Sequence, residues 1–79
     1  MKNNILKILK DLRPEFDFSE RSDFFEEGLL DSFDLISFVS ELEGFYKVSI
    51  KGTDIVPENF KNLESIELLL RKHGAVDES

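Results

Sequence analysis

A serine at the start of a predicted helix is the residue of this 79-residue chain most open to chemistry. In the segment GLLDSFD, Gly28 supplies a turn and two leucines follow as apolar anchors, so that Asp31 and Ser32 stand where the helix begins. A serine there lies beside free backbone N–H groups at the positive end of the helix dipole. A phosphate joined to its hydroxyl would therefore place negative charge where such charge is favoured. The simpler interpretation is a capping pair, because either side chain can accept a hydrogen bond from a free N–H.

The chain lacks the residues that most classes of enzyme need for catalysis. His73 is the only histidine and the chain has no cysteine, which leaves no thiol nucleophile, no histidine or thiolate metal cluster and no obvious acid–base network. Neither GxxxxGK[ST] nor GxGxxG occurs, and the acidic stretch lacks the spacing of a calcium-binding loop. A hydrolase with Ser32 as its nucleophile would lack a base, since His73 lies at the far end of the chain as a helix-end residue. We therefore expect no catalytic residue and no bound metal.

An exposed aromatic side chain next to the serine predicts a docking patch. At ~100° per residue, Phe33 points about 160° away from Leu35, which belongs to the apolar face of the helix. Ile36 lies at the margin of that face, and Asp31 and Asp34 place negative charge close to the aromatic ring. One exposed aromatic needs no explanation, but its combination with acids at a helix start indicates a surface for partner proteins.

The charge balance limits the kinds of partner that the chain can attract. Ten basic and 17 acidic residues give a net charge of −7, and the stretch from Glu15 to Glu43 holds ten acids and one base, Arg21. Such a chain repels nucleic acids and anionic membranes, whereas a basic protein surface would be drawn to the acidic stretch unless the acids form only a solvated face. No apolar run approaches the ~20 residues of a membrane helix. We expect a monomeric, cytoplasmic domain that binds neither nucleic acid nor membranes.

Apolar positions spaced as on one face of a helix recur three times along the chain. Pro14 ends the first helix, the second runs over 32–46, and the third follows the cap Asn62 and stops at Gly74. Their apolar positions are Ile5, Ile8, Leu9 and Leu12; Leu35, Val39, Leu42 and Tyr46, flanked by Phe38 and Phe45; and Leu63, Ile66, Leu69 and Leu70.

The segments between these helices are predicted to be loops with one short helical turn. The connection over 14–30 carries four phenylalanines and two leucines, which predicts that it packs over the core. Residues 47–51 are expected to be extended, 52–54 to form a turn and 57–60 to form the short helical turn. The fold class is therefore all-α: a small bundle of three main helices plus one short helical turn, with a long loop between the first and second helices. One domain covers 1–79, ordered over about 3–73, with a flexible tail at 74–79.

The residues around Ser32 resemble those of acyl carrier proteins, small helical carriers that hold intermediates on a 4′-phosphopantetheine arm. GLLDSFDLISFVSELEGFY is similar to their modification site and second helix, and DFFEEGLLDS to the aromatic-x-x-x-Gly approach to that site. Further on, the pattern Val48-x-Ile50 and the stretch DIVPENF match the latter half of many such carriers. The likeness runs from about Ile5 to Arg71.

The resemblance implies a role for each of these residues. Ser32 would receive the phosphopantetheinyl group of coenzyme A from a separate transferase that uses magnesium, and the thiol of the arm would carry acyl or aminoacyl groups as thioesters. The protein would be a substrate of other enzymes and not an enzyme. Its further partners would be an acyl- or aminoacyl-activating ligase, and acyltransferases or synthases with basic docking patches. The docking residues would be Asp31, Phe33, Asp34, Ile36 and Glu41.

Several positions depart from the carriers of fatty-acid synthesis. Ser37 and Gly44 stand where an acid is usual, and Ser40 where an apolar residue is frequent. Together with DIVPENF they favour a specialised carrier for polyketides, nonribosomal peptides, or aminoacyl or D-alanyl groups. Eight phenylalanines are enough apolar volume to fill the bundle and leave little room for a long acyl chain, but the sequence leaves both alternatives open, a chain sheltered between the helices and a chain left outside. The rival hypothesis is a helical interaction module without a prosthetic group, in which Ser32 only caps the helix; covalent modification of Ser32 separates the two.

Overall fold

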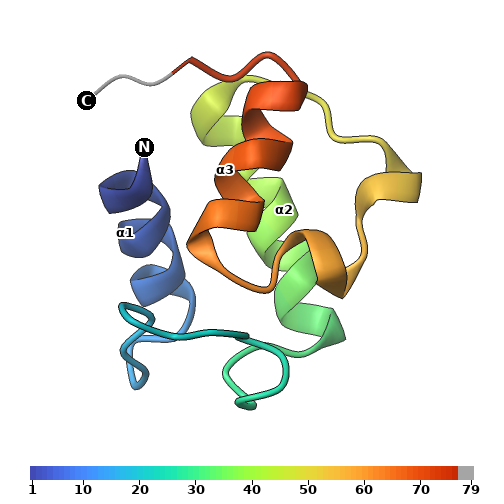
Figure 1. Cartoon of the computed structure of the whole chain (residues 1–79). Coiled ribbons are helices and arrows are strands. Elements are labelled where there is room, and N and C mark those ends of the chain that lie inside the picture. The colour runs from blue at the N-terminus through green and yellow to red at the C-terminus, as the bar shows by residue number, and fades with distance from the viewer. Residues whose placement is uncertain (77–79) are drawn as a thin grey trace.

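Three α-helices form the framework of the computed structural model, which describes residues 1–76 (Figure 1). Helix α1 spans Lys2–Leu12, α2 spans Ser32–Tyr46 and α3 spans Leu63–Lys72. Two short 3₁₀ turns, η1 (Gly52–Asp54) and η2 (Pro57–Asn59), lie between α2 and α3. The predicted all-α bundle with its long first loop is confirmed, and the turn predicted at 52–54 is the 3₁₀ turn η1. Within this part of the chain no helix is long and apolar enough to cross a bilayer.

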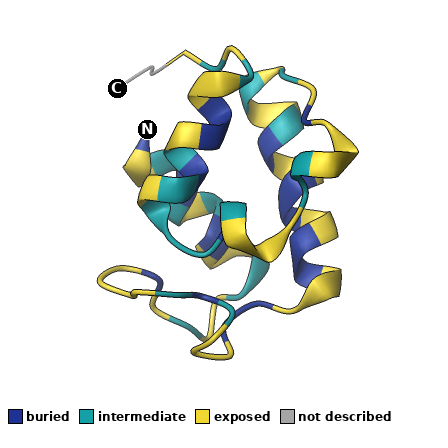
Figure 2. Ribbon diagram, turned by 45° about the vertical axis from the view of Figure 1, so that its right-hand side comes forward, coloured by how far each residue is buried: buried dark blue, intermediate teal, exposed yellow. Residues whose placement is uncertain are grey.

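The core is built from the predicted apolar faces, with one difference in α2. Figure 2 shows the buried residues on the sides of the helices that face the interior. Phe38, expected on the flank, is entirely buried, and its ring packs edge-on against Phe60 with 6.1 Å between centroids. The buried arc of α2 is wider than one stripe because Phe60, which follows η2, covers this side of the helix. Removing each such side chain from water contributes about 1.5–3 kcal/mol.

The long loop between α1 and α2 packs across one end of the bundle, as its apolar residues predicted (Figure 1). Phe18, Phe24, Leu29 and Leu30 are buried, and the rings of Phe18 and Phe24 meet edge to face at 5.3 Å. The N–H of Phe24 donates to the carbonyl of Lys61 at 2.6 Å, which joins the loop to the segment ahead of α3. The loop is therefore part of the packed structure, and it fixes where α2 begins.

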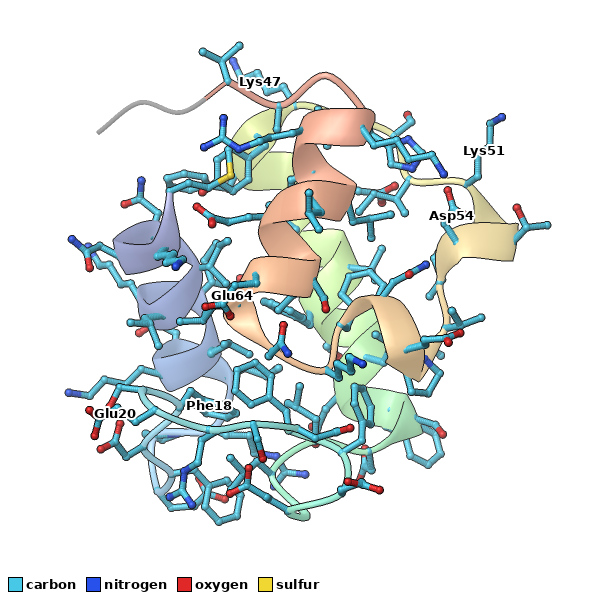
Figure 3. All side chains as sticks on the ribbon, in the orientation of Figure 1. Phe18, Glu20, Lys47, Lys51, Asp54 and Glu64 are labelled. Carbon is cyan, nitrogen blue, oxygen red and sulfur yellow. The ribbon has the colours of Figure 1, made fainter. Side chains whose placement is uncertain are left out.

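The end of α3 is tied to η1 by His73, which occupies the predicted position at the helix end. Its Nε2 lies 3.0 Å from Oδ2 of Asp54, and Nζ of Lys72 lies 3.6 Å from the same oxygen (Figure 3 labels Asp54). The side chains of His73 and Asp54 are 10% and 20% exposed. This contact holds η1 in place, since both groups are partly withdrawn from water.

The last described residues continue past α3 along the bundle. The N–H of Ala75 donates to the carbonyl of Leu70 at 2.9 Å, and Ala75 packs against the core. Residues 77–79 of the tail predicted at 74–79 lie outside the described residues.

The contact at Asp54 should make the stability of the fold depend on pH. The hydrogen bond with His73 holds the pKa of Asp54 below its ordinary value of 3.8, so the folded state favours the charged carboxylate. That stabilisation is present above about pH 4 and is lost as the pH falls through the lower pKa of the folded state. The stability difference between the parent and Asp54→Asn, measured by urea unfolding between about pH 6 and pH 3, should therefore be largest above about pH 4 and shrink below it.

The matched control is Glu58→Gln on the neighbouring turn η2. Glu58 is exposed and forms no ion pair with the residues that the structure describes. The difference in the free energy of unfolding between Glu58→Gln and the parent should change little over the same pH range. A difference for Asp54→Asn that stays constant with pH would contradict the assignment.

Candidate functional site at the start of helix α2

Asp31 caps α2, and Ser32 is the first residue of the helix. The carboxylate of Asp31 accepts a hydrogen bond from the N–H of Asp34 at 2.9 Å, and the carboxylate of Asp34 accepts one from the N–H of Asp31 at 3.2 Å. This reciprocal capping box satisfies two backbone donors at the helix start. The bond from the Asp34 N–H is also the main cause that lowers the pKa of Asp31. Of the two caps that the sequence allowed, the structure uses Asp31.

An arginine ties this first turn to the end of α1. Arg13 is the residue that ends α1, and its Nε lies 3.1 Å and 3.0 Å from the two carboxylate oxygens of Asp34. Its Nη2 lies 2.9 Å from Oδ2 of Asp34 and 3.8 Å from Oδ2 of Asp31, while Nη1 lies 3.4 Å from Glu15. Charge-assisted contacts of this forked kind are short and directional. The hydrogen bonds to Asp34 raise the pKa of Arg13 above its ordinary value.

Ser32 itself takes no part in the capping box. It is exposed, and its hydroxyl makes no hydrogen bond with the residues that the structure describes. The capping box closes across the backbone of Ser32, and Arg13 contacts both carboxylates of that box. The side chain of Ser32 stays accessible. Across residues 1–76, no group of three or more acidic or histidine side chains is placed to hold a metal ion.

Four of the five predicted docking residues are accessible on α2 or directly before it. Phe33 is 83% exposed and Ile36 is 67% exposed, and both Asp31 and Glu41 are exposed as well. Asp34 differs from the expectation, because only 12% of its side chain is exposed and the arginine occupies its carboxylate. These contacts give Asp34 a structural role at the start of α2, and its docking role remains a prediction.

A hollow beside the docking residues was not expected from the sequence. It measures about 500 Å³ and lies between α1 and α2. Ile36 and Glu41 border it on α2, and Ile8, Asp11 and Leu12 border it on α1. The surface that carries the predicted docking residues thus extends from α2 onto α1. Local spacing could not show this, because it does not tell which helix lies beside α2.

Comparison with known proteins decides the family. Residues 3–70, most of the chain, match the family described as a phosphopantetheine attachment site. The chain belongs to this family. D-alanyl carrier proteins from two strains of Lactococcus lactis subsp. cremoris are each 32% identical to it over 68 residues, which cover 84% of this chain and 86% of the relative. The predicted carrier family is confirmed, and with it a covalently attached 4′-phosphopantetheine as the cofactor of a protein that is not itself catalytic.

The residues at the start of α2 fit such a group. An exposed hydroxyl without a hydrogen-bond partner can be esterified without breaking a contact of the fold, and a long arm attached there can extend into solvent. A phosphate at the first residue of α2 lies at the positive end of the helix dipole. The carboxylate of Asp31 is a nearby negative charge, and Arg13, 3.8 Å from it, offsets part of that charge.

The division of roles between Asp31 and Ser32 can be tested on the unmodified protein. Asp31→Ala removes the cap of α2 and should lower the Tm by roughly 5 °C, the usual effect of a lost cap in a domain of this size. Ser32→Ala should leave the Tm within about 2 °C, because no hydrogen bond of the fold is lost. Thermal unfolding followed by circular dichroism gives both values. A larger drop for Ser32→Ala than for Asp31→Ala would show that Ser32 is the cap.

Proposed function

We propose that Ser32 is the residue to which 4′-phosphopantetheine is attached. The observation that carries this proposal is the exposed hydroxyl at the first position of α2, free of hydrogen bonds with the described residues. Ser32 also lies within the matched residues 3–70. The group, once bound, supplies a terminal thiol that holds an acyl or aminoacyl unit as a thioester. The chain contributes a fixed anchor for the arm at one edge of a surface that partners can approach.

The partner enzymes are proposed to dock on the exposed side of α2. Phe33 and Ile36 offer apolar area, and Asp31 and Glu41 offer negative charge beside it. The net charge of −7 would speed the encounter with basic patches on the transferase, on an activating ligase and on the enzymes that receive the cargo. A small docking surface that combines apolar and charged side chains suits a carrier, which must bind and leave several enzymes in turn.

The cargo is proposed to be a small aminoacyl unit. Two relatives with 32% identity are D-alanyl carrier proteins. The core gives a second argument, because Phe24, Phe38 and Phe60 have no exposed surface. Protein interiors are close-packed, and forcing extra methylene groups into such a core costs about 1–3 kcal/mol or more. A long acyl chain would therefore gain little by entering the bundle, whereas a small cargo can remain outside.

Attachment can be tested by intact mass after incubation with coenzyme A, magnesium and a broad-specificity phosphopantetheinyl transferase. The parent should gain one phosphopantetheinyl group, and Ser32→Ala should gain none because the accepting hydroxyl is missing. Ser37→Ala is the matched control, since Ser37 is another exposed serine of α2. It should be modified like the parent. A folded parent that gains no mass, or a Ser32→Ala variant that gains it, would overturn the proposal.

The size of the cargo can be tested by loading the arm with either a D-alanyl or an octanoyl group. Neither should raise the Tm above that of the protein with the unloaded arm by more than about 2 °C, because the filled core offers the chain no new contacts. Thermal unfolding of the three forms gives the comparison. A rise of several degrees with the octanoyl group alone would show that the bundle shelters long chains.

A further inference from the structure

We propose that Arg13 is a positioning residue for the attachment of phosphopantetheine to Ser32. The inference rests on the function proposed above. Arg13 makes no hydrogen bond with Ser32; its contacts are with Asp34 and Asp31, the two residues that close the capping box across that serine. It therefore acts on Ser32 through the backbone that these residues fix.

The first turn of a helix depends on such contacts for its order. Its N–H groups have no partners inside the helix, and helix ends open more easily than helix centres. The hydroxyl of Ser32 has no hydrogen bond with residues 1–76 that would orient it, so its position follows that of the backbone between Asp31 and Asp34. The capping box closes this backbone locally. Arg13 then joins it to the end of α1 through Asp34, whose side chain is 12% exposed.

The charge at the site gives Arg13 a second task. Three carboxylates, those of Glu15, Asp31 and Asp34, lie within 4 Å of its guanidinium group. Coenzyme A is itself anionic. In the transfer, the Ser32 oxygen forms a bond to a phosphorus of its diphosphate as the bond between the two phosphates breaks; the adenosine bisphosphate part leaves, and the serine proton passes to the transferase or to water. The carboxylate of Asp34, whose side chain is 12% exposed, is screened by water less than an exposed carboxylate would be. The arginine reduces the repulsion between these carboxylates and coenzyme A at the reacting hydroxyl, and its loss would also leave the Asp34 carboxylate unpaired.

A positioning role predicts a particular kinetic signature. Ile36 and Glu41, further along α2, keep their places when Arg13 is replaced, so the transferase should still bind through them, but Ser32 should reach the reacting geometry less often. A displacement of about 1 Å can cost up to roughly a hundredfold in rate. We expect Arg13→Gln to lower kcat of modification by about tenfold while KM for the carrier stays within about twofold. A purely structural role would lower stability without changing kcat of the folded protein.

The experiment is steady-state modification by the transferase, followed by intact mass, at a temperature at which circular dichroism shows each variant folded. Lys51→Gln removes one positive charge elsewhere, from an exposed lysine that forms no ion pair with the described residues, and should match the parent. Arg13→Lys keeps the positive charge but not the guanidinium group that contacts Asp34 through two nitrogens, and it should recover only part of kcat. Amide exchange in Arg13→Gln should be faster at Phe33 and Asp34 and unchanged at Leu42 in the centre of α2.

Arg13→Gln modified with the kcat of the parent, or with a loss confined to KM, would overturn the positioning role. Full recovery by Arg13→Lys would overturn it as well, because charge alone would then be sufficient. If Arg13→Gln does not fold, Asp34→Asn is measured in the same way, since it keeps an oxygen for the capping box and removes the charge that holds the guanidinium group. A parent that is not modified at all would be the failure of the proposed function, not of this inference.

Discussion

The ion pair between Arg13 and Asp34 joins the end of the first helix to the first turn of the second. Its two partners lie 21 positions apart, and the whole long loop runs between them. Asp34 also belongs to the capping box with Asp31, so one carboxylate serves both the helix start and the link between helices. Because Ser32 lies inside that box, its backbone is fixed by groups on two separate helices while its hydroxyl remains free.

The packed loop supports the same region from the other side. Phe18 and Phe24 anchor it in the core, and the hydrogen bond from Phe24 to Lys61 connects it to the start of α3. The bundle is small, so stability depends on filling its interior with a few large rings. A carrier must present an arm that reaches several enzymes, and that task is easier when the anchor does not move. The packed loop and the Arg13 pair together hold the start of α2 against the rest of the bundle.

Much of the fold and part of the site could be predicted because both depend on local spacing. The start of α2, the cap Asn62 of α3 and the exposed Phe33 all follow from helical periodicity and capping chemistry within a few residues. The pair of Arg13 with Asp34 could not be predicted, because the chain folds back over a long loop to form it. The full burial of Phe38 also depends on a distant residue, Phe60, which local patterns do not bring beside it.

The most direct measurement is peptide mapping of the protein purified from its own cells. Trypsin should release the peptide 22–47, which contains four serines: Ser22, Ser32, Ser37 and Ser40. We predict a phosphopantetheinyl group that fragment ions locate between Asp31 and Phe33, with any cargo attached at its thiol. An unmodified Ser32, or the group on another serine of this peptide, would contradict it.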